Sequence, residues 1–210
     1  LILILLTGLI LGGCAPVRPG TTPSAENAAP EMTPVSLGVG YIPSVQFAPF
    51  YVGIDQGFFA EEGIDLSLEY GYENDYLTLV GSGDRQFMVG SGDQVILGRA
   101  QQMPVIYVYR WFSQFPVVAF AKAEAEIHVP ADLAGKKVGI PGAFGASWIA
   151  LLALLDAGDL TTEDVQIEAI GFTQAAAISA GLVDVATDYA VNGPIVLAQE
   201  GIATTQIAVD

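Results

Sequence analysis

The sequence has very little positive charge, histidine or cysteine. Its 210 residues include seven Lys or Arg, one His and one Cys, against 23 Asp or Glu, and the formal net charge is −16. This balance argues strongly against a nucleic-acid partner, because binding to phosphates needs clustered basic side chains. A single cysteine also excludes an intrachain disulfide. With 52% hydrophobic residues, the chain still has enough apolar side chains for one large or two small folded domains.

The sequence also lacks the motifs of several common enzyme classes. No H-E-x-x-H, C-x-x-C or G-x-S-x-G pattern occurs in it, so zinc-dependent hydrolysis, dithiol redox chemistry and a serine nucleophile elbow have no supporting motif. The one histidine, His128, lies in a polar connecting stretch, where a surface role is more common than a catalytic one. We therefore expect a protein that is not an enzyme and that has no metal site and no cofactor.

The N-terminal residues are typical of an export signal followed by a tether. Residues 1–11 read LILILLTGLIL, an apolar run far shorter than the roughly 20 residues of a membrane-spanning helix. We expect residues 1–13 to be a signal peptide whose basic start is missing. Residues 11–14, Leu-Gly-Gly-Cys, resemble the bacterial lipobox, so Cys14 is the expected lipid anchor. The alternative is a plain signal peptide with an incidental cysteine.

The stretch after the anchor is predicted to be a flexible linker. Residues 14–34 are rich in Pro, Ala, Ser, Thr and Gly and have no periodicity. The protein is therefore expected outside the cytoplasm, anchored by lipid to the cell membrane. We also expect the chain to be truncated at both ends.

From Val35 onward, short strand-like runs alternate with short helical runs, which predicts an α/β fold with a parallel sheet flanked by helices. The first helix is predicted at residues 48–60, where Phe47, Phe50, Ile54 and Phe58 have the spacing of one buried face. Asp93 has the position of an N-cap ahead of a helix at residues 95–101. Strands are predicted at residues 37–41, 65–70, 87–89, 105–109, 117–121, 137–140, 165–170, 183–189 and 204–209.

A change of pattern after the middle of the chain predicts two lobes. The boundary is expected between Phe112 and Lys122, with lobe 1 at residues 35–116 and lobe 2 at residues 117–210. Both parts contain the same order of strand end, glycine turn, helix, breaker and strand. This repetition predicts two α/β lobes of similar design that face one another.

Polar or glycine-rich turns follow several predicted strands, and aromatic residues accompany them. In α/β sheets such strand ends converge on one crevice, and a helix that starts there offers free backbone N–H groups. Some turns also have a plainer explanation: residues 91–94 as a helix cap, residues 111–115 as core or hinge packing, and Asp188 as a surface charge. The candidate ligand contacts are Tyr41, Gln46, Phe47, Ser91, Asp93, Gln94, Trp111, Phe115, Phe144, Ser147, Asp188, Tyr189 and Asn192.

The chemistry of these residues suits a planar, uncharged aromatic ligand. Each pair of stacked rings adds about 0.5–1.5 kcal/mol beyond the burial of its area, and apolar pockets use a few polar groups to orient the ligand. Arg85 and Arg99 fall beside or within predicted helices rather than at strand ends. A strongly anionic ligand is therefore disfavoured.

Five stretches together carry a resemblance to a known family: residues 40–43 (GYIP), 49–52 (PFYV), 57–64 (GFFAEEGI), 89–93 (VGSGD) and 133–141 (LAGKKVGIP). They resemble the ABC-transporter substrate-binding lipoproteins of the thiamine-pyrimidine-precursor-binding family, relatives of the alkanesulfonate and nitrate binders. The resemblance implies a two-lobed type II periplasmic-binding-protein fold, a ligand held between the lobes, and delivery to a permease and its ATPase. It also implies that lobe 1 is completed by a C-terminal return that is missing after Asp210.

Within that family, residues 46–49, 91–94 and 142–147 are most similar to the branch that binds riboflavin. Riboflavin is therefore the first expected ligand. The alternatives are a thiamine pyrimidine precursor and, less favoured, a sulfonate or nitrate. Outside this class, an enzyme of the pyrimidine-synthesis type needs His and Cys residues that the sequence lacks, and a ligand-sensing module needs a long segment after Asp210.

Overall fold

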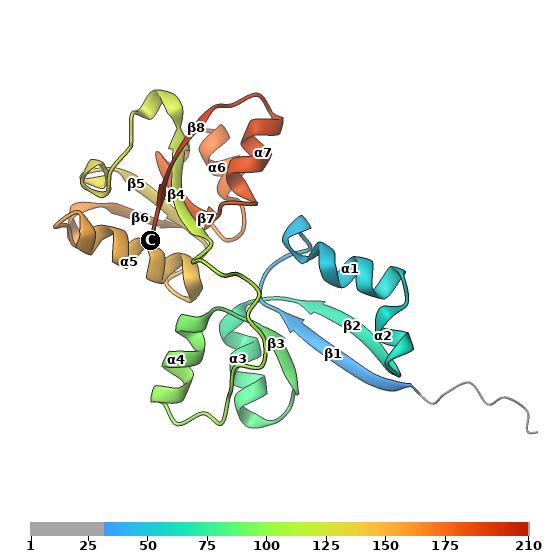
Figure 1. Ribbon diagram of the computed structural model, residues 1–210. Helices are drawn as coiled ribbons and strands as arrows, with labels where there is room; N and C mark the ends of the chain where they lie inside the picture. The colour runs from blue at the N-terminus through green and yellow to red at the C-terminus, as the bar shows by residue number, and fades with distance from the viewer. Residues whose placement is uncertain (1–31, 210) are drawn as a thin grey trace, which may run out of the picture. The chain divides into compact units, whose positions relative to one another are not determined.

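The computed structural model describes residues 32–209, which form two α/β lobes (Figure 1). The predicted signal peptide, Cys14 and most of the predicted linker lie outside these residues. The sheet of lobe 1 has the strand order β2-β1-β3 and is parallel throughout. Its first strand starts before Val35, the predicted start of the folded part, because residues 33–34 pair with the second strand. The strands are β1 (Thr33–Val39), β2 (Ile64–Tyr70) and β3 (Phe87–Val89).

The sheet of lobe 2 is mixed, with the order β6-β5-β7-β4-β8. β4 runs antiparallel to both of its neighbours, whereas β5 is parallel to β6 and β7. The prediction of a purely parallel sheet is therefore wrong for β4. Alternation of strands and helices predicts parallel pairing only for strands that a helix connects, and β4 enters lobe 2 from lobe 1 without a helix. The strands are β4 (Val117–Lys122), β5 (Lys137–Ile140), β6 (Gln166–Ala169), β7 (Val185–Tyr189) and β8 (Thr204–Ala208).

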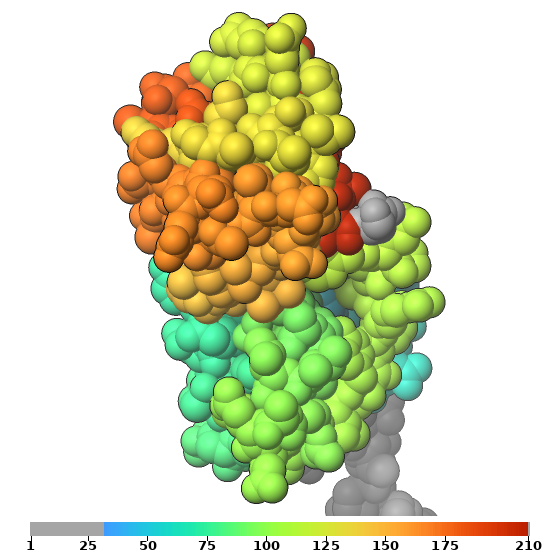
Figure 2. Space-filling model, turned by 90° about the vertical axis from the view of Figure 1, so that its left-hand side faces the viewer, coloured from blue at the N-terminus to red at the C-terminus, as the bar shows by residue number. Residues whose placement is uncertain are grey.

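Helices follow the strands in both lobes, and α4 of lobe 1 contacts α5 of lobe 2 on the face that Figure 2 shows. Lobe 1 contains η1 (Val45–Phe47), α1 (Ala48–Asp55), α2 (Phe58–Glu61), α3 (Glu73–Ser82) and α4 (Gly92–Ala100). Lobe 2 contains η2 (Ala123–Ala125), η3 (Pro130–Leu133), α5 (Gly145–Ala157), η4 (Thr162–Asp164), α6 (Gln174–Ser179) and α7 (Gly193–Gln199).

Lobe 2 has a buried core on both faces of its sheet. On one face, α5 packs Leu151 and Leu155 against Val138 and Val185 of the strands. On the other face, α6 and α7 pack against Phe120 and Ala186. Strand side chains alternate between the two faces, so a sheet covered by helices on both sides needs apolar residues in unbroken runs. The sequence of β4, VVAFAK, meets this requirement.

The predicted helix at residues 48–60 is two helices, and only part of its predicted apolar face is buried. Gly57 has a left-handed backbone (φ 77°) and separates α1 from α2, as glycine commonly does at a helix end. Phe47 is buried, but Ile54 and Phe58 are 41% and 57% exposed. Phe58 follows the break, so its spacing from the residues of α1 no longer places it on their face. Ile54 precedes the break and lies in the last turn of α1.

The strand predicted at residues 105–109 is not formed. Val105 is buried, but Ile106, Val108 and Tyr109 are each more than 70% exposed. An apolar run becomes a strand only where a neighbouring strand satisfies its N–H and C=O groups, and within residues 32–209 no strand pairs with this run. All the other predicted strands are present. Those at residues 87–89 and 137–140 have the predicted bounds, and the others differ at one or both ends.

Asp93 is not the N-cap of its helix. The helix α4 already begins at Gly92, so Ser91 occupies the N-cap position. The carboxylate of Asp93 instead accepts a hydrogen bond from the side chain of Gln94 at 3.0 Å.

Across residues 32–209, no helix has both the length and the apolar character that crossing a membrane requires.

Truncating a core residue of lobe 2 tests this packing. We expect Leu151→Ala to lower the free energy of unfolding by about 3 kcal/mol, because Leu151 is fully buried and the substitution leaves a cavity. Urea unfolding followed by the fluorescence of Trp148, which packs against the same core, measures the change. The control is Leu182→Ala at a side chain that is 64% exposed. Equal effects of the two substitutions would contradict the assignment of the core.

Candidate functional site

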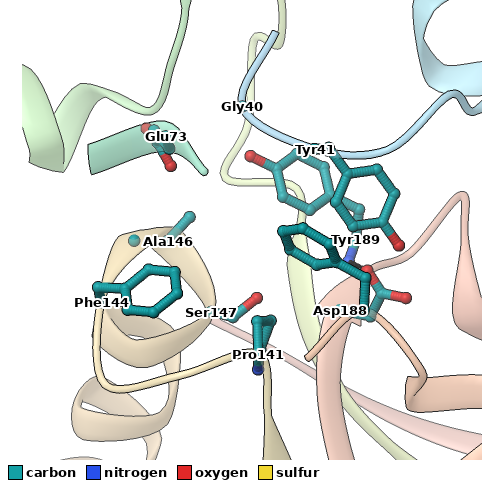
Figure 3. Close-up of a pocket in the computed structure, with 11 residues that line it drawn as sticks. Gly40, Tyr41, Glu73, Pro141, Phe144, Ala146, Ser147, Asp188 and Tyr189 are labelled. Atoms are coloured by element: carbon teal, nitrogen blue, oxygen red, sulfur yellow. Dashed lines mark hydrogen bonds between the residues drawn. The ribbon is translucent and has the colours of Figure 1, made fainter. Parts of the chain in front are cut away.

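The C-terminal ends of strands from both lobes meet at one cavity (Figure 3). Lobe 1 contributes Gly40 and Tyr41, which follow β1, and Glu73, which begins α3 after β2. Lobe 2 contributes the turn after β5, the turn after β6 and the end of β7. The residues of lobe 2 in this cavity are Pro141, Phe144, Gly145, Ala146, Ser147, Phe172, Asp188 and Tyr189.

Aromatic rings from the two lobes fill most of this cavity. The rings of Tyr41 and Phe172 lie 4.8 Å apart at 68°, and those of Tyr72 and Phe144 lie 5.3 Å apart at 84°. The ring centroids of Tyr72 and Phe172 lie 5.2 Å apart, with the rings tilted by 36°. These ring contacts leave a cavity of only about 40 Å³, far below the roughly 300–1,000 Å³ of small-molecule sites. A planar ligand therefore needs the two lobes to move apart before its ring can lie between theirs.

Glu73 places a buried carboxylate from lobe 1 beside the start of α5 in lobe 2. Its Oε1 accepts hydrogen bonds from the backbone N–H and the hydroxyl of Ser91. A Cβ added to Gly145 would make a tight contact of 3.3 Å with its Oε2, and the left-handed backbone of Gly145 (φ 69°) also favours glycine there. Burial raises the pKa of Glu73, although hydrogen bonds from Ser91 oppose the rise. In Figure 3 this side chain faces Ala146 at the first turn of α5.

Asp188 is a second buried carboxylate, at the end of β7. It accepts hydrogen bonds from the backbone N–H groups of Tyr189 and Gly193, at 2.7 and 3.0 Å. Burial outweighs these bonds and raises its pKa from 3.8 to about 6. Burial and then the negative charge of Asp188 raise the pKa of Tyr41. The hydroxyl of Tyr41 therefore keeps its proton and remains a hydrogen-bond donor in the cleft.

A second, larger cavity adjoins the first and shares Tyr41, Phe172 and Asp188 with it. Its volume is about 570 Å³, and it lies between residues 41–45 of lobe 1 and the helices α6 and α7 of lobe 2. The hydroxyl of Ser44 donates a hydrogen bond to Oδ1 of Asn192 at 2.7 Å and so joins the lobes at this cavity. The residues that line the two cavities include no Lys, Arg or His. Both cavities therefore suit uncharged or donor-rich ligands.

The structure brings about half of the predicted contacts together. Tyr41, Phe144, Ser147, Asp188 and Tyr189 line the first cavity, and Asn192 lines the second. Ser91 reaches the site through its hydrogen bonds to Glu73.

The other predicted contacts lie elsewhere in the described chain. Phe47 belongs to the core of lobe 1, and the neighbouring Gln46 is also buried. The ring of Trp111 stacks on that of Phe50, with centroids 4.7 Å apart. Phe115 packs against the buried cluster of β4 and α5, while Asp93 and Gln94 bond to each other.

Sequence reasoning missed several residues at the two cavities, among them Tyr72, Glu73, Phe172 and Gln174. Tyr72 and Glu73 follow β2, and Phe172 and Gln174 follow β6. Both turns have the strand–turn–helix order that identified the other contacts, so applying that rule to every strand end would have found them.

Within residues 32–209, no group of three potential ligand side chains is placed to hold a metal ion.

A family model described as NMT1/THI5 like matches residues 44–210. The chain is 40% identical over 207 residues to the riboflavin-binding protein RibY of Chloroflexus aurantiacus, covering 96% of this chain and 59% of that protein. It is 31% identical over 186 residues to the formylaminopyrimidine-binding protein of Halalkalibacterium halodurans, covering 88% of this chain and 54% of that protein. The chain thus spans little more than half the length of these relatives.

Solved structures establish the fold. The alkanesulfonate-binding protein SsuA from Xanthomonas axonopodis pv. citri, bound to MOPS, matches with a TM-score of 0.60 at 19% identity, over 85% of this chain and 61% of that one. At this identity the similarity concerns the fold alone. The predicted two-lobed type II periplasmic-binding-protein fold is confirmed.

The raised pKa of Asp188 predicts how stability depends on pH. Because the folded protein binds this proton more tightly than the unfolded chain, the contribution of Asp188 is fully present below about pH 4 and is lost as the pH rises through about 6. The loss amounts to about 3 kcal/mol. In Asp188→Asn this part of the pH dependence is absent, whereas Glu73 titrates in both proteins.

Urea unfolding of both proteins between pH 4 and pH 7 tests this prediction. The free energy of unfolding of the unmodified protein minus that of the variant should fall by about 2.4 kcal/mol across this range, most of the full change. A difference that stays constant with pH would show that Asp188 does not titrate there.

Proposed function

Because the chain belongs to the NMT1/THI5-like family, we propose that it is the extracytoplasmic solute-binding component of an ABC importer, and that its solute is riboflavin. The observation that carries the proposal is a cleft lined by aromatic rings and two buried carboxylates, with no cationic side chain among its lining residues. The isoalloxazine ring of riboflavin is planar, uncharged and aromatic. Similarity to a protein named for riboflavin binding supports the same ligand.

The proposed mechanism is capture by closure of the two lobes, followed by delivery to a membrane permease and its ATPase. The rings of Tyr41 and Tyr72 meet those of Phe172 and Phe144 in lobe 2 edge-on. When the lobes open, a flat ring can enter and exchange these edge contacts for face-to-face stacking. The ligand then favours the closed arrangement in proportion to its extra affinity for it. This difference in affinity between the open and closed arrangements is enough for the permease to distinguish the loaded protein from the free one.

A thiamine pyrimidine precursor is the second candidate. The carboxylates of Glu73 and Asp188 are acceptors that can receive the N–H groups of an aminopyrimidine, and one relative is a formylaminopyrimidine-binding protein. A sulfonate or nitrate is less favoured, because binding an anion beside two carboxylates without a cation is costly. The roles of a pyrimidine-synthesis enzyme and of a ligand sensor are not favoured by any feature of the cleft.

Titration of the full-length protein with riboflavin tests the proposal. We expect flavin fluorescence to be quenched on binding, because the flavin stacks on aromatic rings. Phe144→Leu should raise the Kd about fivefold, which corresponds to about 1 kcal/mol for a lost ring contact. The matched control, Phe58→Leu, changes a 57% exposed ring outside both cavities and should leave the Kd unchanged. Unchanged emission with riboflavin, together with binding of an aminopyrimidine, would favour the thiamine-precursor role instead.

We also propose that Cys14 carries the lipid that holds the protein to the cell membrane. Each buried methylene of an acyl chain contributes about 0.8 kcal/mol, so a multiply acylated cysteine gives stable attachment. Metabolic labelling with a tagged fatty acid should label the full-length protein, and Cys14→Ala should abolish the label. A protein that stays unlabelled in cells that label another lipoprotein would contradict the anchor.

A further inference from the structure

The second cavity is much larger than the aromatic one and is built differently. At about 570 Å³, against about 40 Å³, it lies within the roughly 300–1,000 Å³ of small-molecule sites. Tyr41, Phe172 and Asp188 line both cavities, so a ring held in the first cavity can carry a substituent into the second. A ligand that uses both spaces has a planar part and a flexible part.

Two buried residues with side-chain amides, Gln174 and Asn192, belong to the lining of this second cavity. Gln174 begins α6 and is 2% exposed, and its Nε2 has no hydrogen-bond partner among residues 32–209. An unpaired buried donor of this kind costs about 1–3 kcal/mol, which a ligand oxygen would relieve. Asn192 is 7% exposed, and its amide is held between the hydroxyl of Ser44 and the carboxylate of Asp188.

This set of groups matches hydroxyls better than a phosphate or another anionic substituent. A hydroxyl both donates and accepts, so a chain of hydroxyls can accept from Gln174 and donate to Asp188 or to the hydroxyl of Ser44. The two acidic residues of the lining, Asp188 and Glu200, have no Lys, Arg or His beside them in the cavity wall. A phosphate placed there would face like charges without a compensating cation.

From these observations we propose that the second cavity is the subsite for an uncharged polyhydroxyl chain attached to the planar ring. In this subsite Gln174 donates hydrogen bonds to the hydroxyls of the chain. The carboxylates of Asp188 and Glu200 disfavour binding of the phosphorylated form. The inference rests on the proposed function, because the ligand that has such a chain on an isoalloxazine ring is riboflavin. The site would thereby select riboflavin over its phosphate ester, flavin mononucleotide. The loop at residues 41–45 and the helices α6 and α7 would close over the chain.

Comparing three flavins on the full-length protein tests the subsite. Lumiflavin has the same ring system with a methyl group in place of the chain, and flavin mononucleotide adds a phosphate to the chain. We expect riboflavin to bind at least about tenfold more tightly than either, since several hydrogen bonds of about 0.5–1.5 kcal/mol each are lost in lumiflavin and charge repulsion opposes the phosphate.

A substitution at Gln174 separates a ligand contact from a structural role. Gln174→Leu keeps a similar volume and removes the amide, so it should weaken riboflavin binding about three- to tenfold and leave lumiflavin binding unchanged. If Gln174 only supports the fold, the substitution should weaken the binding of both riboflavin and lumiflavin. The matched control is Gln166→Leu, at an exposed residue of β6 outside both cavities, which should change neither.

The outcomes distinguish this inference from the proposed function. Equal affinities for riboflavin and lumiflavin would overturn the subsite while supporting a flavin-binding function. Flavin mononucleotide binding as tightly as riboflavin would overturn the rejection of phosphate. If none of the three flavins binds, the proposed function fails and the subsite fails with it. The comparison of ligands on the unmodified protein stands even if Gln174→Leu does not fold.

Discussion

Edge-to-face contacts between aromatic rings of the two lobes are the interaction on which the cleft depends. Tyr41 and Tyr72 of lobe 1 meet Phe172 and Phe144 of lobe 2 in this way, and each contact is worth about 0.5–1.5 kcal/mol beyond its buried area. Contacts of this strength help to hold the lobes together, and they are weak enough for contacts with a bound ligand to replace them. The same rings join the two lobes and are placed to stack on a planar ligand, so contact between the lobes and recognition would use one set of side chains.

The electrostatics of the cleft are as important as its rings. Glu73 and Asp188 are buried, yet backbone N–H groups and the hydroxyl of Ser91 stabilise them instead of cationic side chains. Among the residues the structure describes, the one ion pair joins Arg85 to Glu69 in lobe 1. Carboxylates without cations attract donors and repel anions. This arrangement disfavours an anionic ligand, although the fold is shared with a sulfonate-binding protein.

The candidate site was predictable to the extent that each contact belongs to a local strand–turn–helix pattern. Phe144, Ser147, Asp188 and Tyr189 lie where the strand-end rule put them. Phe47 lies elsewhere, because it follows the turn at residues 41–45 that lines the cavities and packs into the core of lobe 1. The run at residues 105–109 has the composition of a buried strand, but pairing with a neighbour decides whether such a run becomes one. Composition alone does not supply the neighbour.

The sequence by itself determined the α/β class, the order of strands and helices, and the aromatic, cation-poor character of the strand ends. These properties depend on residues close together in the chain, where periodicity, glycine turns and charge act directly. Only the tertiary structure decided the reversed direction of β4, the pairing of Tyr41 with Phe172, and the division of the cleft into two cavities. Each of these depends on contacts between distant residues, whose geometry is set by how the two lobes pack.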